Sequence, residues 1–300
     1  MKNIETKWLE DFLILEEYRN FSQAAEKRNL SQSAFSRRIM ALEEVLEVKL
    51  FDRAATPLQL TAQGKLFHSQ TRNLLQQLRD NLDELLGHNC HLANIKFAAA
   101  HSLSLSIMPH LIKQLSHGND NFVYSVEAID VDQTVNTLIE GKSDFIFSFY
   151  DEKLMQPPFI ALEILQSKLY PVAPIDITGE PLFRLSDQSI PLLNYTPNSY
   201  MGRLVNRKLA QTNQINIKTK FISSMSELLK NMLLNQQGIA WLPEYSIREE
   251  LQNRKVAILD NEELVIPIKG YIYRMDTKLN SVAEKFWNDL RHISFYQVNN

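Results

Sequence analysis

The sequence predicts a multidomain α+β protein with an N-terminal winged helix-turn-helix, a long linker helix and a C-terminal α/β domain of two lobes. Three observations predict it. A helix, a tight corner and a second helix fit within residues 20–38, a leucine-rich helical pattern starts at Thr61, and strand-like and helix-like segments alternate after residue 94. Three hundred residues with 44% apolar side chains are enough for about two domains with sizeable cores.

Basic residues are clustered in one short segment, although the chain as a whole is not basic. The net charge is −3, and residues 1–60 carry nine Lys and Arg against ten Asp and Glu. Between residues 27 and 38, however, there are four basic residues and no acidic one: Lys27, Arg28, Arg37 and Arg38. Such a cluster is often only a solvated face, but this one coincides with the helix-turn-helix pattern, where it can attract phosphates.

The sequence shows no signs of export or membrane insertion. A single cysteine, Cys90, excludes an internal disulfide and indicates a reducing compartment. The N-terminus lacks the charged start and apolar core of a signal peptide, and no apolar run reaches the ~18 residues of a membrane span. We therefore expect a cytoplasmic protein with no membrane partner.

The two short helices share one small core. Ala24 and Ala25 let the helices approach closely, and Ser22 and Ser31 are expected to cap the first and the second helix. The second helix also has an opposite, polar face whose side chains can reach base edges and phosphates. The apolar residues are Phe21, Leu30, Phe35, Ile39, Leu42 and Leu46, and the polar face carries Gln32, Ser33, Ser36 and Arg37.

The segments before and after the helix-turn-helix make this motif more specific. An amphipathic helix with Trp8, Phe12, Leu15 and Tyr18 precedes the pair, and a turn and short strand follow it as a wing. This order resembles the N-terminal domain of LysR-type transcriptional regulators, in Ala24-Ala25, Ser31-Gln32, Ala34, Ser36, Leu42-Glu43, Leu50-Phe51, Arg53, Leu60-Thr61 and Gly64. The resemblance implies operator DNA as partner, and the expected DNA-binding residues are Ser22, Gln23, Ser31, Gln32, Ser33, Ser36, Arg37, Arg38 and Arg53.

Two positions depart from that family pattern. Ser33 stands where the family usually has proline, and it still suits the first turn of a helix. Glu47 stands where the family usually has glycine after the recognition helix. If Glu47 adopts positive φ, we expect a strain of about 1 kcal/mol, which a packed domain tolerates.

Residues 61–88 are expected to form a linker helix that follows a DNA-binding domain at 1–60. Its apolar stripe consists of Phe67, Leu74, Leu75, Leu78, Leu82, Leu85 and Leu86. The stripe fits a homodimer seam or, alternatively, the core of a domain; we favour the dimer, which would place two recognition helices about one DNA turn, or a multiple of it, apart. Family resemblance further implies a homotetramer.

Residues 89–94 are the expected hinge. His88, Cys90 and His91 lie in or beside it, but their spacing matches no zinc framework and lacks a fourth ligand. We therefore expect no metal and no cofactor.

Residues 95–300 are expected to form an α/β domain with a largely parallel sheet. Strand-like segments are 95–100, 122–128, 145–149, 160–165, 169–173, 191–194, 218–222, 238–242, 256–259, 264–268 and 270–274; helix-like ones are 103–115, 131–140, 200–210, 225–235, 244–251 and 281–290. The chain is expected to cross twice between lobe I (about 95–165 and 267–300) and lobe II (about 166–266). This arrangement resembles the periplasmic-binding-protein-like effector domain of LysR-type regulators.

Ligands of open α/β sheets bind where strands end and helices begin. These places predict Ser102, Ser148, Ser199, Met201, Ser224 and Met225 as effector or signal residues. The hydroxyls can also be helix caps, and methionine often only fills gaps in a core.

The segments AAAHSLSLS, NSYMGRL and SSMSELLK resemble hypochlorite-responsive LysR-type regulators, which implies oxidation of Met201 and Met225 as the signal. A third methionine of that pattern falls on Leu115. The alternative within this class is a regulator that senses an ordinary small metabolite. A more distant alternative is an α/β enzyme or a solute-binding protein, but the sequence lacks a phosphate loop, metal-ligand spacing and a nucleophile elbow, so we expect no catalytic residues.

Overall fold

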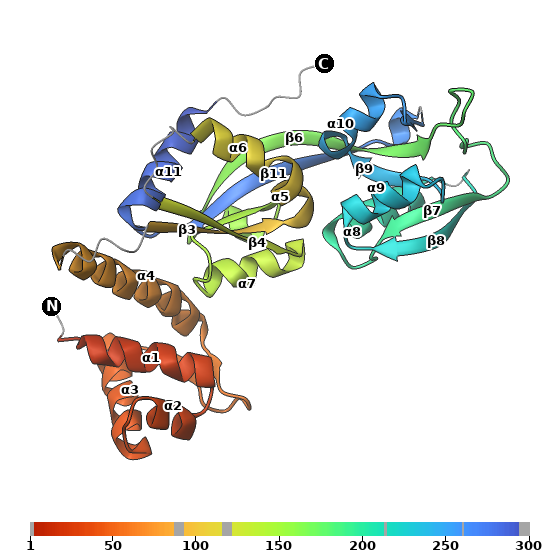
Figure 1. Cartoon of the computed structure of the whole chain (residues 1–300). Coiled ribbons are helices and arrows are strands. Elements are labelled where there is room, and N and C mark those ends of the chain that lie inside the picture. Colours follow the sequence, from red (N-terminus) through yellow and green to blue (C-terminus); the bar gives the residue numbers. More distant parts are fainter. Residues whose placement is uncertain (1–2, 87–92, 116–121, 213–214, 260, 294–300) are drawn as a thin grey trace.

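The computed structural model describes residues 3–86, 93–115, 122–212, 215–259 and 261–293. A small helical domain comes first in the chain, a long helix follows, and a two-lobed α/β domain completes it (Figure 1).

The N-terminal domain packs three helices and a short hairpin around one core. Phe12, Phe35 and Ile39 are fully buried in it, and Ala24 and Ala25 lie at the helix contact as expected. Its elements are α1 (Thr6–Tyr18), α2 (Phe21–Lys27), α3 (Gln32–Leu46), β1 (Phe51–Asp52) and β2 (Gln59–Leu60). The winged helix-turn-helix is thus confirmed.

The caps differ from expectation at one of the two helix starts. Asn20, not Ser22, caps α2, because its side chain accepts hydrogen bonds from the N–H groups of Ser22 (2.9 Å) and Gln23 (3.2 Å). The helix begins at Phe21, which leaves Ser22 in the first turn. Ser31 does cap α3 by accepting from the N–H of Ala34 at 3.2 Å, and Glu47 ends α3 with φ of 59°.

Helix α4 (Ala62–Leu85) starts inside the N-terminal domain. The Thr61 hydroxyl accepts a hydrogen bond from the Gly64 N–H at 2.9 Å, as an N-cap does. A Cβ atom on Gly64 would lie 2.0 Å from the Leu50 carbonyl oxygen, so only glycine fits at this crossing of helix and wing. Phe67 and Leu75 then pack against the core of the domain.

His68 on α4 is buried beside helix α1. It is 5% exposed, and its Nε2 lies 3.5 Å from Glu16 Oε2. Burial lowers the pKa of His68 below the ordinary 6.5, and the charge of Arg72 on α4 acts in the same direction, whereas Glu16 and Glu140 oppose the shift. The neutral imidazole is therefore favoured in the folded chain.

We expect α4 to open more easily as the pH falls below 6.5, the ordinary pKa of histidine. The unfolded segment gains a proton there that the buried His68 resists, so the stabilisation is present above this pH and is lost as the pH falls. Hydrogen exchange of α4 amides, corrected for intrinsic rates, measures this effect. If the His68→Gln variant kept the same pH dependence, another group would be responsible.

Two long strands connect the lobes of the α/β domain. β6 (Phe159–Pro174) pairs antiparallel with β11 (Ile266–Met275) from Leu169↔Ile266 to Phe159↔Met275. The prediction of two separate strands in place of each of them is wrong. Backbone hydrogen bonding continues through the polar stretch at 166–168 and through the register shift at Gly270/Tyr271.

The sheet is mixed rather than largely parallel, so that expectation is also corrected. The strand order is β10-β6-β11-β5-β3-β4, with β9 also paired to β6. Parallel ladders join β3 to β4 and β5, whereas β6 and β11 pair antiparallel because they run back and forth between the lobes. β7 and β8 form a separate two-stranded parallel sheet. The remaining strands are β3 (Ala93–Ala100), β4 (Phe122–Ile129), β5 (Phe145–Phe149), β7 (Ile190–Tyr195), β8 (Ile217–Ser223), β9 (Ala240–Pro243) and β10 (Val256–Ile258).

Helices cover both faces of the sheet in lobe I. On one face Phe97 packs against Phe286 of α11 (5.1 Å between ring centroids), and on the other Leu138 of α7 packs with Ala98 and Ile146. The predicted helix 103–115 is two helices, with Pro109 in the first turn of the second. The helices of lobe I are α5 (His101–Ser106), α6 (Met108–Leu115), α7 (Thr134–Ile139) after the 3-10 turn η1 (Val131–Gln133), and α11 (Ser281–His292).

Lobe II contains β7, β8, β9 and β10 and three helices. These are α8 (Tyr200–Ala210), α9 (Ser226–Leu234) and α10 (Glu244–Gln252). Two further 3-10 turns precede the long strands: Lys153–Met155 lies before β6 and Glu262–Leu264 before β11. Among the described helices, none has the length and apolar character needed to cross a membrane.

Candidate functional site

The outer face of α3 is polar and accessible. Gln32, Ser33 and Arg37 are exposed, and Ser36 is half-buried. The hydroxyl of Ser31 is engaged by the Ala34 N–H and lies 3.2 Å from that of Ser33. The described residues supply no ion pair for Arg37, so its guanidinium is available to a partner.

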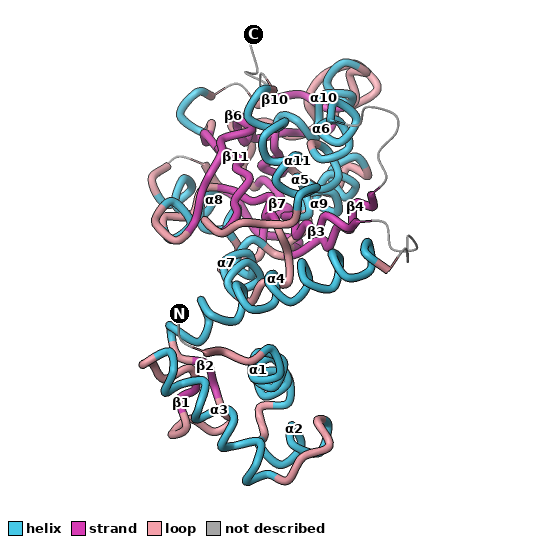
Figure 2. Tube along the Cα trace, turned by 90° about the vertical axis from the view of Figure 1, so that its left-hand side faces the viewer, coloured by secondary structure: helices cyan, strands magenta, loops and turns pink. Residues whose placement is uncertain are grey.

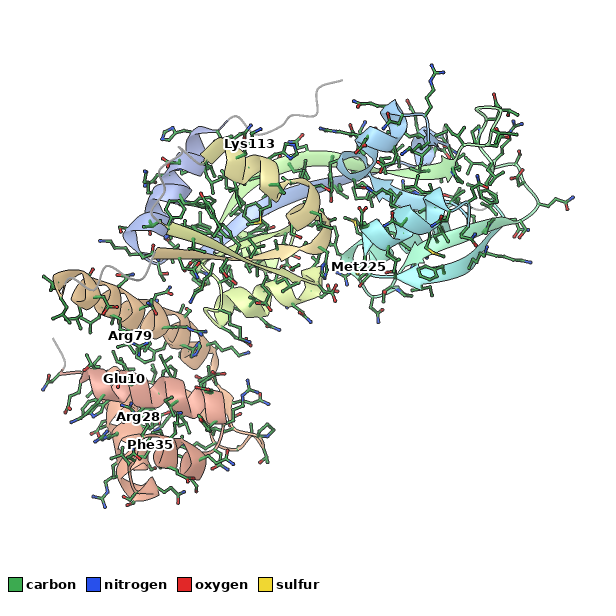
Figure 3. The ribbon with its side chains drawn as sticks, in the orientation of Figure 1. Glu10, Arg28, Phe35, Arg79, Lys113 and Met225 are labelled. Atoms are coloured by element: carbon green, nitrogen blue, oxygen red, sulfur yellow. The ribbon has the colours of Figure 1, made fainter. Side chains whose placement is uncertain are left out.

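One buried carboxylate forms ion pairs with two of the four basic residues between positions 27 and 38. Asp11 is fully buried in α1 and accepts from Arg28 Nε at 2.6 Å and from Arg38 Nη1 at 3.2 Å. Arg28 also contacts Glu10 Oε2 at 2.7 Å; Figure 3 shows both side chains. Asp11 therefore fixes the corner of the helix-turn-helix, and the free positive charge of the cluster is concentrated on Lys27 and Arg37.

A second buried carboxylate fixes the wing. Glu43 is 2% exposed and accepts from the N–H groups of Leu50 (2.9 Å) and Phe51 (3.3 Å). Its Oε2 also accepts from Lys49 and from Arg53, each at 3.2 Å. The Arg53 guanidinium lies 5.5 Å from the ring centroid of Phe21, so it is held between the wing and the start of α2, where the exposed Ser22 and Gln23 side chains also lie.

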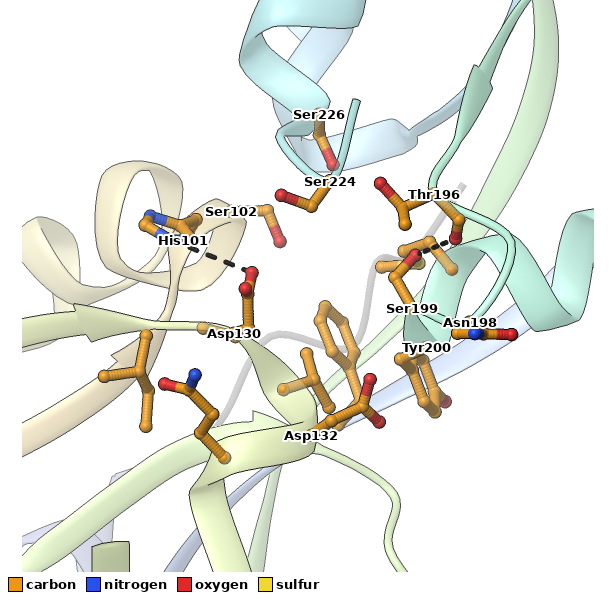
Figure 4. A pocket seen from close by; sticks show the side chains of 16 residues that line it. His101, Ser102, Asp130, Asp132, Thr196, Asn198, Ser199, Tyr200, Ser224 and Ser226 are labelled. Carbon is orange, nitrogen blue, oxygen red and sulfur yellow. Dashed lines mark hydrogen bonds and ion pairs between the residues drawn. The ribbon is translucent and has the colours of Figure 1, made fainter. Parts of the chain in front are cut away.

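A cavity of about 230 Å³ opens between the two lobes (Figure 4). Four of the six predicted signal residues line it: Ser102, Ser199, Met201 and Ser224. The other lining residues are Ala100, His101, Ile129, Asp130, Val131, Asp132, Gln133, Phe149, Thr196, Asn198, Tyr200 and Ser226.

Two of the cavity hydroxyls, those of Ser102 and Ser199, have structural partners. Ser199 caps α8: its Oγ accepts from the Gly202 N–H at 3.2 Å and donates to the Thr196 carbonyl at 2.7 Å. Ser102 Oγ accepts from the Tyr245 hydroxyl at 2.9 Å, which joins lobe I to lobe II. Ser199 is therefore a cap as well as a lining residue, and Ser102 is the hydroxyl whose partner lies across the cleft.

Two further contacts cross the cleft. Arg203 Nη2 on α8 donates to Asp132 Oδ1 at 2.9 Å, and the Tyr200 ring stacks on Phe149 at 4.9 Å with an interplanar angle of 8°. Burial raises the pKa of Tyr200 to about 12, so its hydroxyl is neutral at physiological pH. On the wall of lobe I, His101 Nε2 lies 4.0 Å from Asp130 Oδ1.

Three residues of the cleft, Asp130, Asp132 and Arg203, were not predicted from the sequence. Asp130 directly follows β4 and Asp132 lies two residues farther on, which is the position that the strand-end rule selects. No local pattern pairs Asp132 with Arg203, because the two residues are far apart in the sequence.

Two predicted signal residues lie outside the cavity. Ser148 is fully buried in β5, and its hydroxyl has no hydrogen-bond partner among the described residues. Met225 occupies the N-cap position of α9 with 39% of its surface exposed and lines a small neighbouring hollow (Figure 3). Met201 is 6% exposed in the first turn of α8, and Leu115, at the position of the third methionine, is buried in α6.

The expected hinge residues His88, Cys90 and His91 lie outside the described residues. Within the described part of the chain, no group of three His, Cys, Asp or Glu side chains could hold a metal ion.

Helix α4 presents an exposed row of leucines. Leu75 faces the core, but the row that points away from the domain carries Leu66, Leu74, Leu78, Leu82 and Leu85, with exposures from 37% to 82%. Spacings of three, four and eight residues place these side chains along one side of the helix.

Two models of known protein families match this chain, one in its N-terminal part and one in its C-terminal part. The model of the bacterial regulatory helix-turn-helix protein, LysR family, matches residues 6–65, and that of the LysR substrate binding domain matches residues 93–293. The HTH-type transcriptional regulator YjiE of Escherichia coli (strain K12) is 55% identical over 294 residues, which cover 98% of this chain and 96% of that protein.

Two of the similar solved structures cover nearly the whole chain. HypT from Salmonella typhimurium, described as a hypochlorite-specific LysR-type transcriptional regulator, is 55% identical, with 97% of this chain and 98% of that chain covered and a TM-score of 0.63. DarR from Vibrio fischeri, solved in complex with DNA, is 41% identical, with 97% and 100% covered and a TM-score of 0.63.

Proposed function

Because the chain belongs to the LysR family of DNA-binding transcriptional regulators, we propose that α3 binds operator DNA and that oxidation of Met201 and Met225 by hypochlorite is the signal. The family matches in both halves set aside the enzyme and the solute-binding protein as alternatives. We propose a cytoplasmic location for this chain, since a regulator must meet its operator DNA there.

DNA recognition is assigned to the exposed face of α3. Gln32, Ser33 and Arg37 are proposed to reach base edges in the major groove, because their side chains are exposed and point away from the core. Ser22, Gln23, Ser31, Ser36 and Arg53 are proposed to contact the sugar-phosphate backbone around the groove. Arg38 keeps one guanidinium nitrogen on Asp11, so it reaches phosphate only with the remaining ones.

The exposed leucine row of α4 supports a homodimer. Two copies that bury this row against each other would hold two α3 helices at a fixed separation, as a two-fold related operator requires. The homotetramer rests on family resemblance alone.

The position of Met201 is the main support for oxidation by hypochlorite as the signal. It lines the cavity in a chain that is 55% identical to a hypochlorite-specific regulator. A sulfoxide at this buried position would place a polar group in an apolar contact and displace the first turn of α8. The alternative is a metabolite that binds in the same cavity.

The test treats purified full-length protein with hypochlorite and then with methionine sulfoxide reductases, measuring operator affinity and methionine mass after each step. We expect a change in affinity that the reductases reverse and that Met201→Leu reduces or removes, with Met225→Leu tested beside it. Met40→Leu is the control, because Met40 is 42% exposed on α3 and its oxidation could disturb DNA binding directly. Oxidised Met201 with unchanged affinity would favour the metabolite.

We expect Ser102→Ala to change the response to the signal while leaving the unstimulated operator affinity nearly intact. The substitution removes the partner of the Tyr245 hydroxyl across the cleft but no DNA-contacting group. Operator affinity with and without hypochlorite measures both quantities. An equal loss of DNA binding in Ser102→Ala and Arg37→Ala would show that the two roles are not separate.

A further inference from the structure

We propose that helix α7 links the cleft mechanically to the DNA-binding domain of the same protomer, with Arg203, Gly141 and Ser69 as its positioning residues. This inference takes from the proposed function only that the cleft is where the signal acts. The contact between Ser69 and Gly141 is called the α4–α7 joint below.

One end of α7 lies in the cleft. Asp130 and the 3-10 turn η1 line the cavity, and α7 follows η1 without a break. Asp132 of η1 accepts the hydrogen bond from Arg203, which α8 brings from the opposite lobe. Opening or closing of the lobes therefore acts directly on the start of α7.

Helix α7 is short, and it is fixed to its neighbours by a hydrogen bond and by apolar packing. Six residues at 1.5 Å rise give a length of about 9 Å. Thr134 is fully buried, and its Oγ1 donates to the Val131 carbonyl at 2.6 Å, which fastens α7 to η1. Leu138 packs with Ala98 and Ile146 under the sheet, so α7 moves together with this part of lobe I.

The other end of α7 meets the linker helix backbone to backbone. Gly141 follows the helix with φ of 63°, and a Cβ atom built on it would lie 3.0 Å from Ser69 Cα. Ser69 is 1% exposed. Figure 2 shows α7 lying directly against α4. No side chain separates the two segments at this point, so a displacement of one must be followed by the other.

Helix α4 is in turn part of the DNA-binding domain. The residue before the joint, His68, lies 3.5 Å from Glu16 of α1, and the Phe67 ring lies 5.1 Å from that of Phe12. Farther along, Gln77 Nε2 donates to the Lys278 carbonyl at 3.1 Å, which keeps α4 against the same lobe. A shift at Gly141 thus reaches α1 through packed side chains.

The test uses hydrogen exchange of full-length protein without any oxidant. Arg203→Gln removes the ion pair to Asp132 from the far lobe, and Arg207→Gln is the matched control, an exposed arginine on the same helix for which the described residues supply no ion pair. We expect Arg203→Gln to speed exchange in both α7 and the segment 65–75 of α4 by about two- to fivefold, the size expected of an exposed ion pair. Arg207→Gln should leave both segments unchanged.

Enlarging the joint gives the second measurement. In Ser69→Leu the larger side chain has no space beside Gly141, so it disrupts the close contact between the two segments. In this background we expect Arg203→Gln to change hydrogen exchange in α7 but not in α4. Ser69→Ala should retain the coupling. If Arg203→Gln altered α7 but not α4 in the otherwise unchanged protein, the proposed coupling would be overturned. Because no hypochlorite is used, this result is independent of whether oxidation is the signal.

Discussion

Replacing Arg37 with alanine should weaken operator binding about 10- to 100-fold, the loss expected for a side chain that contacts a base in the major groove. Arg37 is exposed on α3, and unlike Arg28 and Arg38 it has no internal carboxylate among the described residues. Its removal should therefore cost binding without loosening the domain.

Fluorescence anisotropy over a range of salt concentrations measures this loss, with Arg207→Ala in lobe II as the control of equal charge change. If Arg37 contacts a base, affinity falls most for the preferred operator; if it contacts phosphate, affinity falls for all duplexes and the salt slope drops by about one. An unchanged affinity for the operator would remove α3 as the reader.

Replacing Glu43 with alanine should destabilise the N-terminal domain by about 2 to 4 kcal/mol, because the buried N–H groups of Leu50 and Phe51 lose their acceptor. The ion pairs to Lys49 and Arg53 add little, since the side chains of the two cations are 74% and 41% exposed. Loss of Glu43 also releases the wing, so DNA affinity should fall as well.

The neighbouring Glu44 provides the matched control, because it is exposed on the same helix. Opening free energies of α3 amides, from hydrogen exchange of the full-length protein, compare the two variants on one scale. Equal effects of Glu43→Ala and Glu44→Ala would mean that helix charge, not the buried acceptor, explains the loss.

The helix-turn-helix was predictable because its determinants are local. Small residues at the helix contact, the apolar stripe of α3 and the Ser31 cap all follow from neighbours within a few positions. Asp11 was not predictable in this way. Its partners Arg28 and Arg38 lie 17 and 27 residues away, and an aspartate within an amphipathic helix is usually solvated.

The cleft was predictable in its position but only partly in its chemistry. The strand-end rule located Ser102, Ser199, Met201 and Ser224 correctly at the cavity. It failed for Ser148, because successive side chains of a strand point to opposite faces: Phe149 lines the cavity, so its neighbour in β5 faces away.

The extent of β6 and β11 depends on tertiary pairing. A polar stretch and a glycine look like strand ends in a single sequence, yet each strand continues where its partner supplies backbone hydrogen bonds. The same pairing makes the sheet mixed, which no periodicity within one strand reveals.

Guanine N7 methylation interference, carried out on the duplex that the full-length protein selects from a random pool, tests most directly whether two α3 helices enter the major groove. N7 lies in that groove, so methylation should block binding at two patches whose centres are about one helical turn, or a multiple of it, apart. Binding that is indifferent to methylation at every guanine would contradict recognition through α3.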